Sequence, residues 1–401
     1  MSDRNYRPRI FLHLNIFWVF LKLGCTSFGG PVAHLGYFRE EFVARRRWLT
    51  DQAYADLMAL CQFLPGPASS QVGMGLGLSH GGVGGALAAW LGFTLPSAVL
   101  MIAFGLALLN TNLTTGTDWL NGLKVVAVAV VAQALWGMGK NLCPDRARAS
   151  LAAVAALLVI ALPGTWGQLL AMAAGGLIGW RWLHPTQTVS AGNLPSTGKA
   201  LGIASLALFA VLLFGLPLLA NFSDNAYLGL FDSFYRAGSL VFGGGHVVLP
   251  LLQAELVPQG TVSNDLFLAG YGAAQAVPGP LFTFAGYLGA VTGTGPHAVL
   301  LAMTALVGIF LPGFLLLLGI LPLWASARRH PSMQKAMLGV NAAVVGLLLA
   351  AFYDPVWTSA IHSSGDFALA LAAFVALMFW RLPPWLVVIL CAVLPALIGL
   401  L

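Results

Sequence analysis

Charged residues are scarce in this chain of 401 residues: Asp, Glu, Lys and Arg make up 8% of it, where a soluble domain has about 25%. Hydrophobic residues make up 59% and gather in nearly uncharged runs such as 84–109, 119–139 and 297–321. One membrane-spanning helix needs about 20 apolar residues, so the composition excludes a soluble domain. The runs do not alternate with polar residues, which excludes a membrane β-barrel. The sequence therefore predicts an all-α, polytopic integral membrane protein.

Cysteine is also scarce, since the chain has four. None belongs to a C-x-x-C pair or to a Cys/His cluster with zinc spacing, so we expect no metal site and no cofactor. The net charge of +6 is typical of basic cytoplasmic loops and does not indicate nucleic-acid binding. The basic start resembles a signal peptide, but Lys22 interrupts its apolar stretch and no clean cleavage site follows, so we expect it in the mature protein.

The sequence contains an internal repeat. Phe28-Gly29-Gly30 recurs as Phe242-Gly243-Gly244, an offset of 214 residues (242 − 28). Pro65-Gly66-Pro67 recurs as Pro278-Gly279-Pro280, an offset of 213 (278 − 65). We call these motifs the FGG breaks and the PGP turns. The same registers align Lys22 with Arg236, Glu41 with Glu255, Asp51 with Asp265, and Gln62 with Gln275. The predicted organisation is an N-terminal repeat at 1–182, a polar linker at 183–199, a linking transmembrane helix at 200–220 and a C-terminal repeat at 221–401.

The loop charges predict that the two halves are inverted in the membrane. Loop 36–50 contains four arginines, whereas its partner 250–265 has no basic residue. In each of the other two loop pairs, only one loop contains basic residues. Loop 323–335 is basic and its partner 110–118 is not, and loop 140–149 is basic and its partner 353–366 is not. Short cytoplasmic loops collect Lys and Arg, so equivalent loops should lie on opposite sides. About four spanning helices are expected in each half, and the odd helix between the halves would turn the second one over.

The front of each half predicts re-entrant or broken helices. Residues 51–64 and 68–80 are short and meet at a PGP turn, where proline cannot continue a helix. We expect a re-entrant hairpin there and a mirror image of it at 265–294. Residues 10–35 would form a second re-entrant element broken at the FGG motif; alternatively, 10–32 cross the membrane once.

The paired breaks predict a central site for an anion. Irregular backbone persists at membrane depth only where it is buried in protein or lines a wet cavity, and helix N-termini there offer free N–H groups. Lys22 and Arg236 precede the FGG breaks, and an intramembrane charge costs about 3 kcal/mol on insertion scales. Glycine packing, snorkelling cations and structural hydrogen bonds are the alternative interpretations. The candidate substrate-binding residues are Lys22, Phe28, Gly29, Gly30, Gln62, Pro65, Gly66, Pro67, Ser69, Ser70, Gln71, Arg236, Phe242, Gly243, Gly244, Gly245, His246, Gln275, Pro278, Gly279, Pro280 and Thr283.

Acidic residues are few inside the expected membrane segments. Of thirteen Asp and Glu, only Asp56 and Asp232 are expected there, so cationic and dipolar groups outnumber them and favour an anionic substrate. An intramembrane hydrolase would need an acid/base set beside a basic cluster. Glu40, Glu41 and Arg45–Arg47 are the only such group and are expected in a loop. The sequence therefore favours a transporter over an enzyme.

Four motifs in combination resemble the chromate ion transporter family in its long, two-domain form. They are Phe-Gly-Gly-Pro at 28–31, Leu-Pro-Gly-Pro at 64–67, Phe-Gly-Gly-Gly-His at 242–246 and Val-Pro-Gly-Pro at 277–280. The resemblance covers essentially the whole chain and implies chromate export across a bacterial inner membrane, chromate resistance, and sulfate as a substrate analogue. Oxyanion or sulfate uptake and an intramembrane hydrolase are the alternatives. The expected partners are the oxyanion and the lipid bilayer, and a homodimer is left open.

Overall fold

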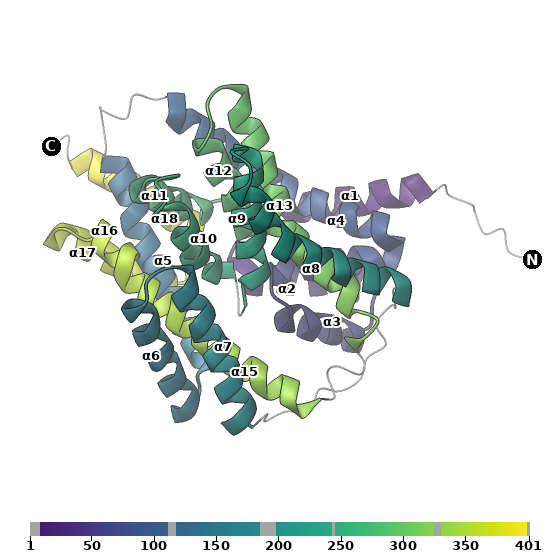
Figure 1. Ribbon diagram of the computed structural model, residues 1–401. Coiled ribbons are helices and arrows are strands. Elements are labelled where there is room, and N and C mark those ends of the chain that lie inside the picture. The colour runs from purple at the N-terminus through teal and green to yellow at the C-terminus, as the bar shows by residue number, and fades with distance from the viewer. Residues whose placement is uncertain (1–8, 111–117, 185–197, 243–244, 325–329, 399–401) are drawn as a thin grey trace, which may run out of the picture.

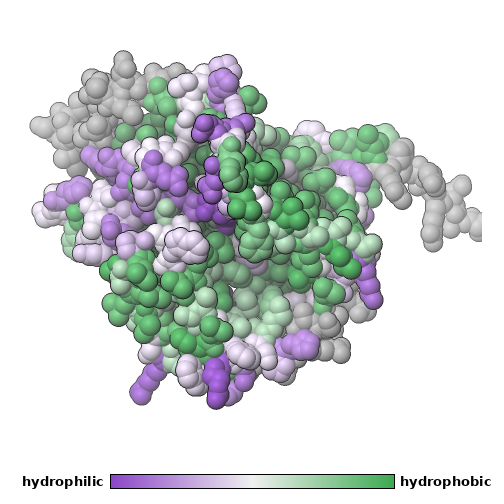
Figure 2. Space-filling view, in the orientation of Figure 1, coloured by the Kyte–Doolittle hydropathy of each residue, from purple (hydrophilic) through white to green (hydrophobic). Residues whose placement is uncertain are grey.

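The computed structural model describes residues 9–110, 118–184, 198–242, 245–324 and 330–398 (Figure 1). Every regular element in these ranges is helical, which confirms the predicted all-α fold. Five helices among the described residues are long and apolar enough to cross a membrane: Ala68–Leu109, Trp119–Leu142, Lys199–Asn221, Pro296–Ile320 and Pro331–Ala360. Large apolar side chains are exposed along several helices, and Figure 2 shows broad apolar surfaces. The chain is thus a multi-pass membrane protein.

The first half runs from α1 to α7. Its elements are α1 (Arg9–Thr26), α2 (Gly30–Phe38), a π-helical turn (Arg39–Arg45), α3 (Asp51–Phe63), α4 (Ala68–Asn110), α5 (Asp118–Leu142), α6 (Arg146–Ala161) and α7 (Thr165–Trp182). The linking helix predicted at 200–220 is α8 (Lys199–Asn221). The predicted linker at 183–199 lies largely outside the described residues.

The second half repeats this order of elements. It comprises α9 (Ala226–Leu240), a 3-10 turn (Gly245–Val247), α10 (Val248–Leu256), α11 (Asn264–Ala274), a 3-10 turn (Leu281–Thr283), α12 (Phe284–Val291), α13 (Pro296–Ile320), α15 (Pro331–Ala351), a π-helical turn (Phe352–Trp357), α16 (Thr358–Ala360), α17 (Ser364–Met378) and α18 (Pro384–Ile398). Helix α9 corresponds to α1, α11 to α3, and α12 with α13 to α4. The predicted two-repeat architecture is confirmed.

Equivalent local signals build equivalent helices in the two halves. Thr50 caps α3 by accepting a hydrogen bond from the N–H of Ala53, and Ser263 caps α11 by accepting one from the N–H of Leu266. Such caps satisfy amides that have no partner within the helix. Asp145 caps α6 in the same way, and the N–H of Arg148 holds the pKa of that carboxyl below its usual range.

The predicted breaks are present in both halves. Helix α4 departs from helical geometry at Gly81 and Gly82, so 68–80 forms a short arm separate from the long helix that follows. The equivalent of Gly82 is Gly295, which precedes α13, and both have positive φ. Several stretches that were expected to be loops are partly helical: 36–50 contains the π-helical turn Arg39–Arg45, 353–366 contains most of Phe352–Trp357 and all of α16, and 250–265 contains the end of α10. Residues 250–256 belong to α10, so Glu255 lies in a helix and is buried, because α10 packs between α9 and α15.

The last two helices of each half pack on a helix of the other half. Helices α6 and α7 pack on α15 of the second half, while α17 and α18 pack on α5 of the first half. At the α7–α15 contact a Cβ on Gly179 would lie 2.7 Å from the Cα of Gly339, so the backbones touch directly, as small residues permit in membrane helices. The two halves therefore share one interlocked core.

Candidate functional site

The PGP turns and the FGG breaks meet between the two halves. The N–H of Gly66 donates a hydrogen bond to the carbonyl of Val241 at 2.7 Å, and the N–H of Gly279 donates to the carbonyl of Ser27 at 2.9 Å. The repeat registers relate Gly66 to Gly279 and Ser27 to Val241. The two bonds are therefore copies of one contact, in which the turn of each half closes against the break of the other.

The glycine at each PGP turn is required by its surroundings. Gly66 and Gly279 have φ angles of 118° and 96°, a region that side chains other than glycine rarely adopt. A Cβ on Gly66 would lie 3.1 Å from the Cα of Gly313 in α13, and one on Gly279 would lie 2.9 Å from Ser97 Oγ in α4. Each turn thus presses on the long helix of the opposite half.

The residues that directly follow the two FGG breaks, Pro31 and Gly245, are also neighbours. A Cβ on Gly245 would lie 3.5 Å from Pro31 Cγ, and these two positions are equivalent in the repeat (245 − 31 = 214). Phe28 is half-buried, with its ring centroid 6.5 Å from that of Trp385, and Phe242 is half-buried too. Gly29 and Gly30 form the turn into α2. Gly243 and Gly244 lie outside the described residues.

Several buried polar atoms at these breaks have no hydrogen-bond partner among the described residues. They are Ser27 Oγ, Ser70 Oγ, Gln71 Oε1 and Thr94 Oγ1. Buried polar groups are almost always paired, so each unpaired group calls for an explanation. Three of the four are hydroxyls, which can each donate a hydrogen bond to an oxyanion. Ser69 and Ser70 lie in the first turn of α4, where the amides have no partner within the helix.

Other predicted polar residues have partners within the protein. The Nε2 of Gln71 donates to the carbonyls of Pro65 at 3.0 Å and Gly313 at 3.2 Å, which ties the first PGP turn to α13. Thr283 donates to the carbonyl of Pro280. The Nε2 of Gln275 lies 3.4 Å from the carbonyl of Tyr271. Gln62 is exposed.

Two histidines flank the site. His246 is bonded to the hydroxyl of Tyr271 through Nδ1 at 2.7 Å. His34 is buried, with Nε2 at 3.2 Å from the carbonyl of Ser27 and Nδ1 at 3.4 Å from Ser69 Oγ. His34 joins the FGG break to α4, a position that the sequence did not predict because His34 and His246 are out of register by two residues.

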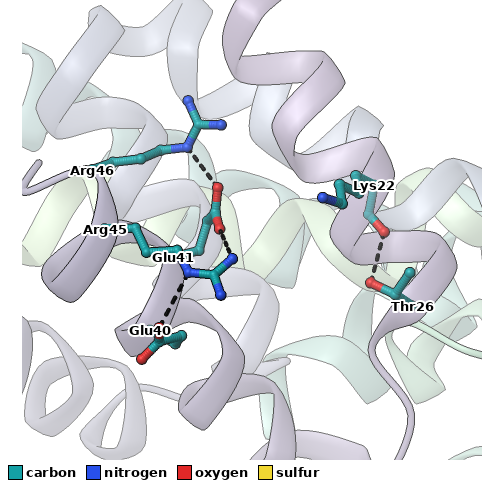
Figure 3. A network of polar contacts seen from close by, with 6 residues as sticks. All are labelled: Lys22, Thr26, Glu40, Glu41, Arg45 and Arg46. Carbon is teal, nitrogen blue, oxygen red and sulfur yellow. Dashed lines mark hydrogen bonds and ion pairs between the residues drawn. The ribbon is translucent and has the colours of Figure 1, made fainter.

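The two predicted cations differ in their surroundings. Lys22 is exposed on α1, and among the described residues its amino group has no ion-pair partner; Thr26 Oγ1 donates to its carbonyl (Figure 3). Arg236, at the equivalent position, forms ion pairs with Asp232 at 2.9 Å and Glu255 at 2.8 Å. Lys22 is therefore the cation whose charge is not already balanced.

The basic loop is occupied by its own ion pairs. Glu40 pairs with Arg45, and Glu41 pairs with Arg45 and Arg46, all within the turn that follows α2 (Figure 3). These four residues belong to the group, completed by Arg47, that an intramembrane hydrolase would need. Their charges are balanced by one another at the protein surface, so the geometry offers no argument for that chemistry.

A family profile described as chromate transporter matches the chain twice, at residues 14–180 and 228–396. The chromate transport protein of Pseudomonas aeruginosa is 32% identical over 344 residues, which cover 84% of this chain and 80% of that protein. The chromate transport protein of Cupriavidus metallidurans is 28% identical, with 83% and 80% covered. The probable chromate transport protein of Synechococcus elongatus is 27% identical, with 93% and 92% covered. No solved structure matches the chain.

Proposed function

This chain belongs to the chromate transporter family, and from that premise we propose that it is a secondary transporter that exports chromate across the bacterial inner membrane and thereby confers chromate resistance. The proposal takes its substrate from the printed names of the relatives, which are chromate transport proteins. Sulfate, which has the same charge and a similar tetrahedral shape, is proposed as a second substrate or competitor.

The observation that carries the proposal is the pair of equivalent hydrogen bonds from Gly66 to Val241 and from Gly279 to Ser27. They bring four breaks in the backbone together where the two repeats meet, which is the usual place for the substrate of a transporter built from inverted repeats. Unpaired buried hydroxyls and the first turn of α4 lie at the same place. These groups donate hydrogen bonds, which suits an oxyanion.

A dianion needs many such donors. Moving one unpaired charge into a low-dielectric interior costs on the order of 20 kcal/mol in the idealised case, whereas one helix N-terminus contributes about 0.3–2 kcal/mol. We propose that the substrate is held by the residues of the PGP turns and FGG breaks, by Ser69 and Ser70, and by the positive field of Lys22. Retained water supplies the remaining hydrogen bonds.

The direction of transport is proposed from the driving force. A membrane potential that is negative inside drives anions outward by about 2.3 kcal/mol per charge per 100 mV. For a dianion this is about 4.6 kcal/mol at that potential. Export therefore needs no other energy source, whereas uptake would need coupling to a cation gradient strong enough to overcome this term.

The test is chromate flux in everted membrane vesicles. Vesicles that contain the protein should accumulate chromate when a potential positive inside the vesicle is imposed, and excess sulfate should reduce the rate. Intact cells should accumulate less chromate and tolerate more of it than empty-vector cells. Greater accumulation by intact cells would instead identify an uptake transporter, and vesicles indistinguishable from empty-vector vesicles at verified expression would contradict transport of chromate.

A further inference from the structure

A second polar site lies along α9, on the N-terminal side of Val241. It is a cavity of about 400 Å³ bordered by α8, α9 and α10. Asp232, Ser233 and Arg236 line its inner part, while Asn221 and Gln259, both exposed, line its outer part. The cavity therefore connects the buried side of α9 with the protein surface.

Arg236 pairs with two acidic side chains, and these differ in how many of their oxygens have hydrogen-bond partners. Glu255 receives hydrogen bonds from Arg236 at 2.9 Å and from the hydroxyl of Thr165 at 2.8 Å, both on Oε1, and its Oε2 pairs with Arg236. Asp232 Oδ2 lies 3.0 Å from Nε of Arg236 and 2.9 Å from Nη2. Asp232 Oδ1 is buried and has no partner among the described residues. Asp232 as a whole is 4% exposed.

The charges of this network do not balance. Asp232 and Glu255 carry two negative charges when ionised, and Arg236 carries one positive charge. No other charged side chain of the described residues lines the cavity, whether from α8, α10 or α13, the helices packed against α9. An uncompensated buried charge is unfavourable, so the network requires one more positive charge.

We propose that Asp232 is a proton-binding residue and that its proton is coupled to transport of the anion, an inference that rests on the proposed transport function. The proton arrives from water in the cavity, which Asp232 lines, and forms an O–H bond with its carboxylate. The carboxylate is thereby neutralised, while Arg236 and Glu255 remain as a balanced pair. Release breaks the same bond and returns the proton to water.

The repeat argues against a purely structural role for Asp232. Its equivalent in the first half is Trp18 (232 − 214), which is exposed. Helix α1 nevertheless packs along α4 as α9 packs along α13. The helix pair thus forms without an acid at this position, and the acid is a specific feature of the second half.

The charge of the network also predicts whether the proton and the anion move in the same direction or in opposite directions. With Asp232 ionised, the network has a net negative charge and repels an entering dianion; with Asp232 protonated, it is neutral. Proton and oxyanion should therefore bind together and move in the same direction. A dianion accompanied by one proton still carries net negative charge, so a potential negative inside still favours its export.

The first test measures protonation without transport. Infrared difference spectra of the purified full-length protein, recorded between an acidic and an alkaline buffer, should show the carbonyl band of a buried carboxylic acid. Asp232→Asn should remove this band, whereas Glu255→Gln and Asp224→Asn, the latter an exposed acid in the loop before α9, should keep it. Absence of the band in the wild type, or its persistence in Asp232→Asn, would overturn the proposal.

The second test measures coupling in proteoliposomes that contain a pH-sensitive dye. Chromate influx driven by a potential should acidify the lumen for the wild type and Asp224→Asn. For Asp232→Asn, the acidification per chromate ion transported should be lower by about tenfold or more. Chromate flux without acidification in the wild type would refute proton coupling while leaving chromate transport intact. No chromate flux at all would refute the transport function, and the infrared titration would then decide proton binding alone.

Discussion

At the scale of single residues, two cations at equivalent positions of the repeat have different surroundings. Arg236 is held by two buried carboxylates, so its charge is already neutralised. Lys22 is exposed and has no ion-pair partner among the described residues. Glu41 is the repeat equivalent of Glu255, but it pairs with Arg45 and Arg46 and not with Lys22. Of these two cations, Lys22 in the first half is therefore the one whose charge is not balanced by an ion pair among the described residues.

Lys22→Gln is expected to reduce the initial rate of chromate transport by about tenfold or more, which corresponds to about 1.4 kcal/mol, because it removes the unbalanced positive charge beside the FGG break. The thermal stability of the protein should be unchanged, since Lys22 forms no ion pair within the described part of the chain. Lys140→Gln is the matched control, because Lys140 lies over the ring of Trp136 near the end of α5. Equal rates for the two variants would show that Lys22 does not act on the anion.

Arg236→Gln is expected to act on stability. The change leaves Asp232 and Glu255 buried without their cation, and breaking a buried pair from one side costs about 3–5 kcal/mol. The melting temperature in detergent should fall markedly. The double variant Arg236→Gln/Asp232→Asn should recover part of the loss, because it removes one of the two uncompensated charges. A double variant less stable than Arg236→Gln would contradict this electrostatic account.

The sequence could predict which residues were equivalent but not what they touch. The register paired Lys22 with Arg236, yet Glu255 was expected in a loop, because no pattern in the sequence shows that α10 extends to Leu256. The contacts at the breaks use the carbonyls of Ser27 and Val241. A backbone acceptor is present in every residue, so side-chain identity gave no signal for either.

At the scale of elements, the PGP turns are the feature that the sequence predicted well. Proline at both ends of each turn stops the helices on either side, and the hairpin of α3 with the first arm of α4 follows directly from this. What the sequence could not predict is that each turn closes on the opposite half. Contacts across more than two hundred residues depend on tertiary packing, and local patterns carry no information about it.

Gly66→Ala and Gly279→Ala are expected to destabilise the protein and to abolish transport. Each introduces a Cβ at positive φ, which costs about 1–2 kcal/mol, and each forces the turn away from the long helix of the other half. Thermal unfolding and vesicle transport would measure the two effects. Gly215→Ala in α8 is the control, because its Cβ would meet nothing within 4 Å and alanine favours a helix by up to about 1 kcal/mol. If all three variants behave alike, the turns are not tightly packed.

At the scale of the whole molecule, the two repeats form one body. Helices α6 and α7 of the first half pack on α15, and α17 and α18 of the second half pack on α5. The contacts at the turns are exchanged in the same way. A change in one repeat therefore reaches the other directly, which is what a transporter needs if its two halves open to opposite sides of the membrane in turn.

The last prediction concerns the inverted orientation of the two halves in the membrane. Arg47 in the basic loop and Gly260 occupy equivalent places, because both have positive φ and each lies three residues before a capping residue, Thr50 or Ser263. The excess of arginine in the first loop predicts that it is cytoplasmic. We therefore expect single cysteines introduced at Arg47 and at Gln259, beside Gly260, to react with a membrane-impermeant maleimide from opposite sides. Gln259 is preferred because it is exposed, whereas Gly260 has a φ of 72°.

The background for this labelling is a variant in which the four native cysteines are replaced by alanine, with transport checked before labelling, because Cys61 and Cys391 are buried. In intact cells only the cysteine at 259 should react, and in everted vesicles only the one at 47. The reverse pattern would keep the inverted repeat but turn the whole protein over, so that the charge bias would no longer explain its orientation. Labelling of both positions from one side would mean that the halves are parallel, and the exchanged contacts at the turns would then have to arise from an axis along the membrane normal.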